Sequence, residues 1–143
     1  MFSQDKNANI TLIIGVNTSG KTTILQSLLW CFYGKARFKT AEKLFNEENA
    51  KLMKENEIKE ISVSVELSHA GEEFIIERKQ LSKKIGSKVE LVGPSKLRIF
   101  RKNELGVTEP INDLYVEDAM NDILPEDLSE DFFYDTERVG NIT

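Results

Sequence analysis

An eight-residue segment near the start of the chain limits the possible folds more than any other feature. It follows five strand-forming residues, 10–14, and precedes a helix-forming segment, 23–30. It fits the pattern G-x-x-x-x-G-K-[ST] and reads Gly15-Val16-Asn17-Thr18-Ser19-Gly20-Lys21-Thr22. A strand, loop and helix in this order form a phosphate-binding loop, because backbone N–H groups surround an anion at the positive end of the helix. The alternative is a glycine-rich turn without a ligand.

The residues of this loop have distinct expected roles. Lys21 should contact the β- and γ-phosphates of a nucleotide, and the Thr22 hydroxyl should bind Mg²⁺. The predicted nucleotide-binding residues are Gly15, Asn17, Thr18, Ser19, Gly20, Lys21, Thr22 and Thr23.

Composition and charge indicate a soluble globular protein. The 143 residues are 40% apolar and 30% charged, which suits one domain with a core of its own. No apolar run approaches the length of a membrane span and no signal peptide opens the chain, so a cytoplasmic protein without membrane contact is expected. The single Cys31 falls on the apolar face of the first helix and is predicted to lie in the core.

The net charge of −5 is unevenly distributed. Residues 112–143 hold one Arg and ten Asp and Glu. This segment is either a surface for a partner or a solvated helix face with carboxylates near a metal. No cluster of Lys and Arg is interleaved with aromatic residues, so these residues show no nucleic-acid footprint of their own.

In the middle of the chain the spacing of apolar residues changes from a helical period to a strand period. A helix is predicted for about 41–57, with an apolar stripe of Leu44, Phe45, Leu52 and Met53. Strands are predicted at 61–67 and 74–78, and a second pair at 89–92 and 97–101 joined by a turn at Gly93-Pro94, which makes 60–102 an antiparallel meander. His69 falls in a turn without neighbouring ligands, so no metal site is expected there.

The acidic end of the chain contains a helix and an aromatic segment. The helix is expected from 112 to near Pro125, with one apolar face formed by Val116, Ala119, Met120 and Ile123. Residues 132–138 then place three aromatic side chains before Asp135 and Glu137. This segment is interpreted as a buried strand that delivers both carboxylates to a polar site, and the alternative is a surface loop.

Together these segments resemble one family. The phosphate loop, residues 30–34, the meander, and Ile123-Leu124-Pro125 before 132–137 are similar to the N-terminal half of the ATPase head in SMC-like ABC ATPases. This group contains the double-strand-break repair ATPases and a branch that acts in bacterial DNA sulfur modification.

The resemblance implies an α/β P-loop NTPase fold, the N-terminal lobe of an ABC-type head. Within 1–143 it implies a phosphate-loop strand and helix (10–34), an antiparallel β-subdomain (60–102), and a helix with a metal-proximal loop (112–138). It also implies an incomplete domain, with the catalytic Glu, signature motif and switch His on a C-terminal half.

The same resemblance implies ATP and Mg²⁺ as ligands, with Asp135 acting on the metal through a water. The complete protein would form a head-to-head homodimer. It would act on DNA with other proteins of a modification or repair system. No catalytic residue is assigned in this chain, which is expected to act as an ATPase only as part of a complete head and to be inactive alone.

Two threonines depart from the family pattern. Thr18 and Thr136 occupy positions where the family usually has Gly, and a β-branched residue resists positive φ. A degenerate interaction module without nucleotide is therefore one alternative. A stand-alone small P-loop kinase or GTPase is another, although the Asn-Lys-x-Asp base reader of a GTPase is missing from the sequence.

Overall fold

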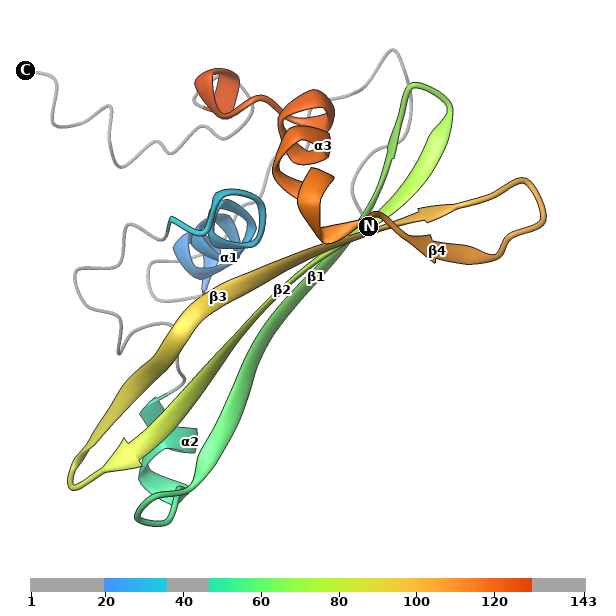
Figure 1. The fold of residues 1–143 in the computed structure, drawn as a ribbon. Helices are drawn as coiled ribbons and strands as arrows, with labels where there is room; N and C mark the ends of the chain where they lie inside the picture. The colour runs from blue at the N-terminus through green and yellow to red at the C-terminus, as the bar shows by residue number, and fades with distance from the viewer. Residues whose placement is uncertain (1–19, 36–46, 130–143) are drawn as a thin grey trace, which may run out of the picture.

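The computed structural model describes residues 20–35 and 47–129 (Figure 1). The predicted strand at 10–14, the first part of the phosphate loop and the aromatic segment 132–138 lie outside the described residues. The described elements are α1 (Lys21–Tyr33), α2 (Glu47–Leu52), β1 (Ile58–His69), β2 (Glu72–Ile85), β3 (Lys88–Lys102), β4 (Thr108–Pro110), a 3₁₀ turn (Asp113–Tyr115), α3 (Val116–Ile123) and a second 3₁₀ turn (Glu126–Leu128).

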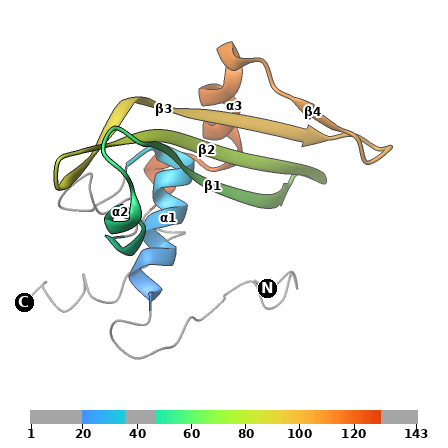
Figure 2. The same cartoon turned by 90° about the horizontal axis from the view of Figure 1, so that it is seen from below.

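The four strands form one antiparallel sheet in the order β1-β2-β3-β4. Each strand pairs with the next one in sequence, as the predicted meander requires, and β2 lies between β1 and β3 along most of its length. The strands are long and twisted, while α1 and α3 pack against the sheet (Figures 1 and 2). The sheet therefore lies beneath α1, the helix that follows the predicted phosphate loop.

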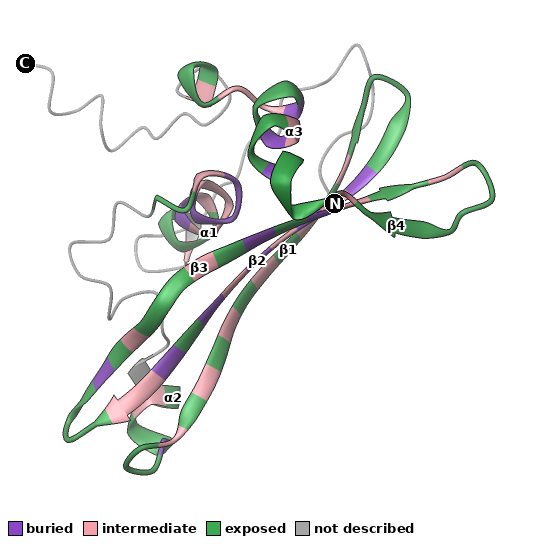
Figure 3. Ribbon diagram, viewed as in Figure 1, coloured by how far each residue is buried: buried purple, intermediate pink, exposed green. Residues whose placement is uncertain are grey.

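Strict alternation in β1 and β2 explains which face of the sheet is covered. Val63 and Val65 of β1 and Ile76 of β2 point toward the helices, and the intervening side chains are mostly polar. Buried residues gather where α1 and α3 meet the sheet (Figure 3). The main core cluster consists of Cys31, Phe32, Phe74, Ile76, Leu97, Ile99, Val116, Met120 and Ile123.

A second, smaller cluster lies at the far end of the sheet. Met53 and Val89 are buried there against Ala50 and Ile61. The Lys84 ammonium donates a hydrogen bond to the Ala50 carbonyl across 2.9 Å, which fixes the end of α2 against β2. The sheet thus has two apolar contacts with helices, and only the first involves α1.

The predicted break between two strands at Gly93-Pro94 is wrong. Residues 88–102 form one strand, β3, and the turn that precedes it lies at 86–87. The β2–β3 register shifts between Lys79 and Leu81, opposite this dipeptide. At this shift Pro94 has no pairing partner in β2, and in the described sheet β4 pairs only with Phe100–Lys102, so the missing N–H of Pro94 removes no ladder hydrogen bond.

The predicted helix at about 41–57 extends too far. The described part of it, α2, ends at Leu52, and residues 53–57 are not helical and contain a turn at 55–56. Asn56 N–H donates to the Lys84 carbonyl, and Lys84 N–H donates to the Glu57 carbonyl. These bonds to β2 override the local helical pattern. Leu52 is 77% exposed rather than part of an apolar stripe, and Leu44 and Phe45 lie outside the described residues.

The other two predicted helices are present. The first helix ends at Tyr33 with Gly34 as its cap. The acidic helix buries its apolar face as predicted, but the α-helix begins at Val116 rather than at 112, because Asp113–Tyr115 forms a 3₁₀ turn capped by the Asn112 side chain. No helix among residues 20–35 and 47–129 is long and apolar enough to cross a membrane.

Candidate functional site

The start of α1 carries the described part of the predicted phosphate loop. Gly20 is the N-cap of α1 and has φ +88°. Its carbonyl accepts the first helical hydrogen bond, from Ile24 N–H across 3.0 Å. A positive φ of this size is strained for residues with a side chain, which explains why the pattern requires Gly at this position.

The first turn of α1 is open to an external anion. Within the described residues it has no side-chain cap and no acidic residue. The first N–H groups of a helix have no partner inside the helix, and together they carry a partial positive charge. Thr22 and Thr23 have exposed side chains. The turn therefore offers N–H donors and hydroxyl oxygens at one place, as binding of a phosphate and its metal requires.

The opposite end of α1 is buried in the sheet. Cys31 is fully buried, and its thiol donates weakly to the carbonyls of Val63 and Ile76, at 3.5 and 3.6 Å. Burial raises the pKa of the Cys31 thiol to about 11, so the neutral form persists at neutral pH. The prediction of a core cysteine is confirmed.

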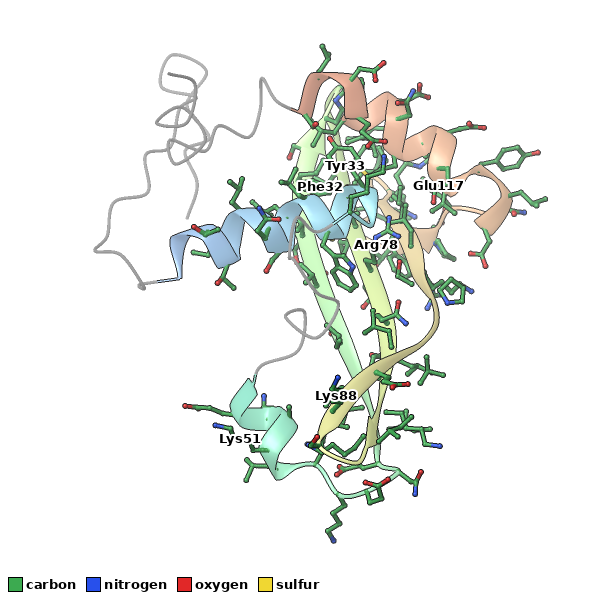
Figure 4. The ribbon with its side chains drawn as sticks, turned by 90° about the vertical axis from the view of Figure 1, so that its left-hand side faces the viewer. Phe32, Tyr33, Lys51, Arg78, Lys88 and Glu117 are labelled. Atoms are coloured by element: carbon green, nitrogen blue, oxygen red, sulfur yellow. The ribbon has the colours of Figure 1, made fainter. Side chains whose placement is uncertain are left out.

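Arg78 binds the buried end of α1 from the inner face of β2. It is 6% exposed. Its Nε donates to the Cys31 carbonyl across 2.9 Å, and its Nη2 donates to the Phe32 carbonyl across 3.3 Å. Its Nη1 donates to the Ser95 hydroxyl on β3 across 3.0 Å. One guanidinium thus connects the last turn of α1 with two strands (Figure 4).

The electrostatic surroundings of Arg78 act in two directions. Burial lowers the pKa of its guanidinium, and the negative charge of Glu117 on α3 raises it. Arginine keeps its proton under ordinary conditions. Arg78 therefore places a positive charge at the negative end of the α1 dipole.

Sequence reasoning did not identify Arg78. The available signal was the position of Arg78 in the alternating pattern of the strand, because it lies on the same inward-facing side of β2 as Ile76 and Gln80. A buried cation on a strand face needs hydrogen-bond acceptors, so an Arg at an inward-facing position indicates a specific hydrogen-bonded contact inside the fold.

The end of α1 also contacts the segment after α3. Tyr33 Oη donates to the Leu124 carbonyl across 3.2 Å, and Lys35 forms an ion pair with Glu126. Burial, together with the charge of Glu126, raises the pKa of the Tyr33 hydroxyl to about 12. The ring of Phe32 meets the Tyr33 ring edge-on, with centroids 6.1 Å apart.

The structure brings together only part of the predicted site. Gly20, Lys21, Thr22 and Thr23 are consecutive at the start of α1. The other predicted residues lie outside the described ranges: Gly15, Asn17, Thr18, Ser19, Asp135, Thr136 and Glu137. His69 is the exposed last residue of β1. In the part of the chain that the structure describes, no group of three His, Cys, Asp or Glu residues could hold a metal ion.

Comparison with known proteins identifies the family. The model of an AAA domain family matches residues 2–135. Because the match covers most of the chain, the protein belongs to this family of SMC-like P-loop ATPases. The family indicates a P-loop NTPase, and the described residues form an α/β fold with a four-stranded antiparallel sheet. No curated protein and no solved structure matches the chain.

Proposed function

We propose that the chain binds ATP with Mg²⁺ at the start of α1. The observation that carries the proposal is the left-handed Gly20 followed by an open helical turn, in a chain of the P-loop ATPase family. Backbone N–H groups of this turn bind the β-phosphate, and Lys21 neutralises the charge between the β- and γ-phosphates.

The described residues fit a magnesium nucleotide. The exposed Thr22 hydroxyl is an oxygen ligand of the kind Mg²⁺ prefers, and no carboxylate stands in the first turn to compete with the phosphates. When bound, Mg²⁺ neutralises phosphate charge. Asp135 is proposed to orient a water on the metal, because it matches the residue with that role in the SMC-like heads that this chain resembles.

At a finer level, we propose the N-terminal lobe of an SMC-like ABC head, of the DndD branch that acts in DNA sulfur modification or of a related repair system. The combination of phosphate loop, antiparallel sheet and Asp-x-Glu segment supports this proposal. Two heads would enclose ATP as a homodimer, and the complete assembly would act on DNA. In such a head the catalytic Glu belongs to the C-terminal half, so the proposed role of these residues is binding rather than hydrolysis.

A second candidate is an interaction module that has lost nucleotide binding. Thr18 and Thr136 favour it, because each places a β-branched residue where the family usually has Gly. Backbone strain of this kind costs about 1–3 kcal/mol at each position, enough to weaken a phosphate site by one or two orders of magnitude.

Calorimetric titration of ATP and GTP, with and without Mg²⁺, separates these functions. We expect ATP binding that strengthens with Mg²⁺ and no phosphate release by the chain alone. Lys21→Ala should abolish binding, and Lys51→Ala, which removes the same charge from α2, should leave it unchanged.

Asp135→Ala should reduce mainly the dependence on Mg²⁺. Equal loss in Lys21→Ala and Asp135→Ala would contradict the role of Asp135. Absence of binding by the wild type would favour the interaction module, and phosphate release by the wild type would contradict the restriction to binding.

A further inference from the structure

The two ends of α1 perform different tasks. Its first turn is the proposed phosphate site, and its last turn holds the Arg78 guanidinium. The helix has 13 residues and is therefore about 20 Å long. A helix of this length moves as a rigid rod, so a displacement at one end also moves the other.

The Arg78 contact is built for a planar, three-branched donor. Each of its nitrogens donates one hydrogen bond: two end on the carbonyls of Cys31 and Phe32, and one ends on the Ser95 hydroxyl. The last carbonyls of a helix lack helical partners, so the guanidinium supplies donors that α1 itself cannot provide. A lysine ammonium could not reach all three acceptors in this geometry.

Gly34 provides the space for this contact. A Cβ atom at Gly34 would lie 3.0 Å from Arg78 Nη1 and 3.2 Å from Arg78 Cζ. The residue that caps α1 thus leaves room for the guanidinium that binds the helix. Burial of this charge is costly without partners, so the described contacts fix the relative position of α1 and the sheet.

We propose that Arg78 is a positioning residue for the nucleotide site, and that it couples the antiparallel sheet to the phosphate-binding turn through α1. This inference rests on the proposed ATP-binding function. Coupling between two sites is reciprocal. If contact of α1 with the Arg78 guanidinium favours ATP binding, then bound ATP also stabilises the contact of the buried end of α1 with the sheet.

The first test compares ATP–Mg²⁺ affinities of Arg78 variants by calorimetry. Arg78→Met keeps much of the side-chain length and removes all three hydrogen bonds; it should weaken binding at least tenfold. Arg78→Lys should recover part of this loss. Retention of wild-type affinity by a folded Arg78→Met protein would overturn the inference.

Gln80→Met is the matched control. Gln80 lies two residues further along the same face of β2 and is also buried, at 5% exposed. Its side-chain amide donates hydrogen bonds to the carbonyls of Leu81, Val92 and Gly93, within β2 and β3. Its substitution should lower stability and change ATP affinity less than twofold. An equal loss of affinity in both variants would show a general effect of destabilisation and would overturn the inference.

The second test needs no change at Arg78. Cys31 is the only cysteine of the chain and lies at the interface of α1 with the sheet, so its labelling by Ellman's reagent reports separation of the two. ATP–Mg²⁺ should slow this labelling several-fold. In the double variant Cys31→Ala, Met53→Cys, the thiol lies in the second, smaller cluster at the far end of the sheet, and it should label at the same rate with and without ATP.

These outcomes distinguish the inference from the proposed function. Failure of the wild type to bind ATP would overturn the proposed function. Binding without slower labelling of Cys31, or equal slowing at both thiol positions, would overturn the coupling alone. If Arg78→Met does not fold, Ser95→Ala replaces it, since it removes only the Nη1 hydrogen bond; a folded Ser95→Ala protein should bind ATP several-fold more weakly, and unchanged affinity would overturn the inference.

Discussion

Tyr33 donates a hydrogen bond from its hydroxyl to the carbonyl of Leu124 across 3.2 Å, and 91 residues of sequence separate the two. This bond joins the last residue of α1 to the cap of α3. Together with the Arg78 contacts, it connects the end of α1 both to the sheet and to the segment that ends the acidic helix. The phosphate-loop helix is therefore fixed at its far end by two elements that are distant in sequence.

Tyr33→Phe should lower the free energy of unfolding by about 0.5–1.5 kcal/mol, the typical contribution of one such hydrogen bond. Urea denaturation followed by circular dichroism measures the change. Tyr115→Phe is the matched control, because the Tyr115 side chain is largely exposed; its effect should stay within about 0.5 kcal/mol. Equal effects of the two substitutions would contradict a specific role for the Tyr33 hydroxyl.

Gly34→Ala should destabilise the fold more than Gly71→Ala. Both glycines have positive φ, +67° and +79°, so both substitutions impose backbone strain of about 1–3 kcal/mol. At Gly71 the added Cβ meets no atom within 4 Å, whereas at Gly34 it meets Arg78 Nη1 at 3.0 Å. The difference between the two urea midpoints therefore isolates the Arg78 contact. Equal losses of stability would show that the Arg78 guanidinium can move away from the added Cβ atom without destabilising the fold.

Much of this fold is predictable from local patterns. The helix after the phosphate loop, the β1–β2 hairpin and the acidic helix follow from periodicity and from turn residues. The continuous β3 strand was not predictable, because Gly93-Pro94 is a typical turn dipeptide. It is accommodated by a register shift in the neighbouring strand, which a local pattern cannot reveal.

Only one part of the candidate site, the start of α1, could be proposed from the sequence. Gly20 to Thr23 were assigned to a phosphate site because phosphate binding demands those residue types at that spacing, and this assignment stays a prediction. Arg78 was not identified, since its partners are the backbone carbonyls of Cys31 and Phe32, which have no sequence signature. Contacts made to the backbone depend on tertiary placement and become visible only in the structure.

Alkaline pH should destabilise the protein through Cys31. Burial raises the pKa of this thiol from 9.0 to about 11. Between these values the unfolded chain loses the proton and the folded chain keeps it, so the free energy of unfolding falls as pH rises. The slope is at most about 1.4 kcal/mol per pH unit.

Urea denaturation of the wild type and of Cys31→Ala between pH 8 and 11 measures this contribution. The stability of Cys31→Ala should fall less steeply above pH 9. Tyr33, whose pKa is raised to about 12, contributes in the same direction above pH 10 in both proteins and cancels in the comparison. Parallel pH profiles would contradict the assigned role of Cys31.

Thr22→Val should remove the magnesium dependence of ATP binding while leaving the fold intact. The side chain is exposed in the first turn of α1, and Val resembles Thr in shape and helix propensity, so stability should change by less than about 0.5 kcal/mol. Calorimetry with Mg²⁺ and with EDTA measures the metal dependence. Thr22→Ser keeps the hydroxyl and should retain the enhancement by Mg²⁺. An undiminished enhancement in Thr22→Val would mean that the metal is held by other groups, because only the hydroxyl oxygen distinguishes these two variants as ligands.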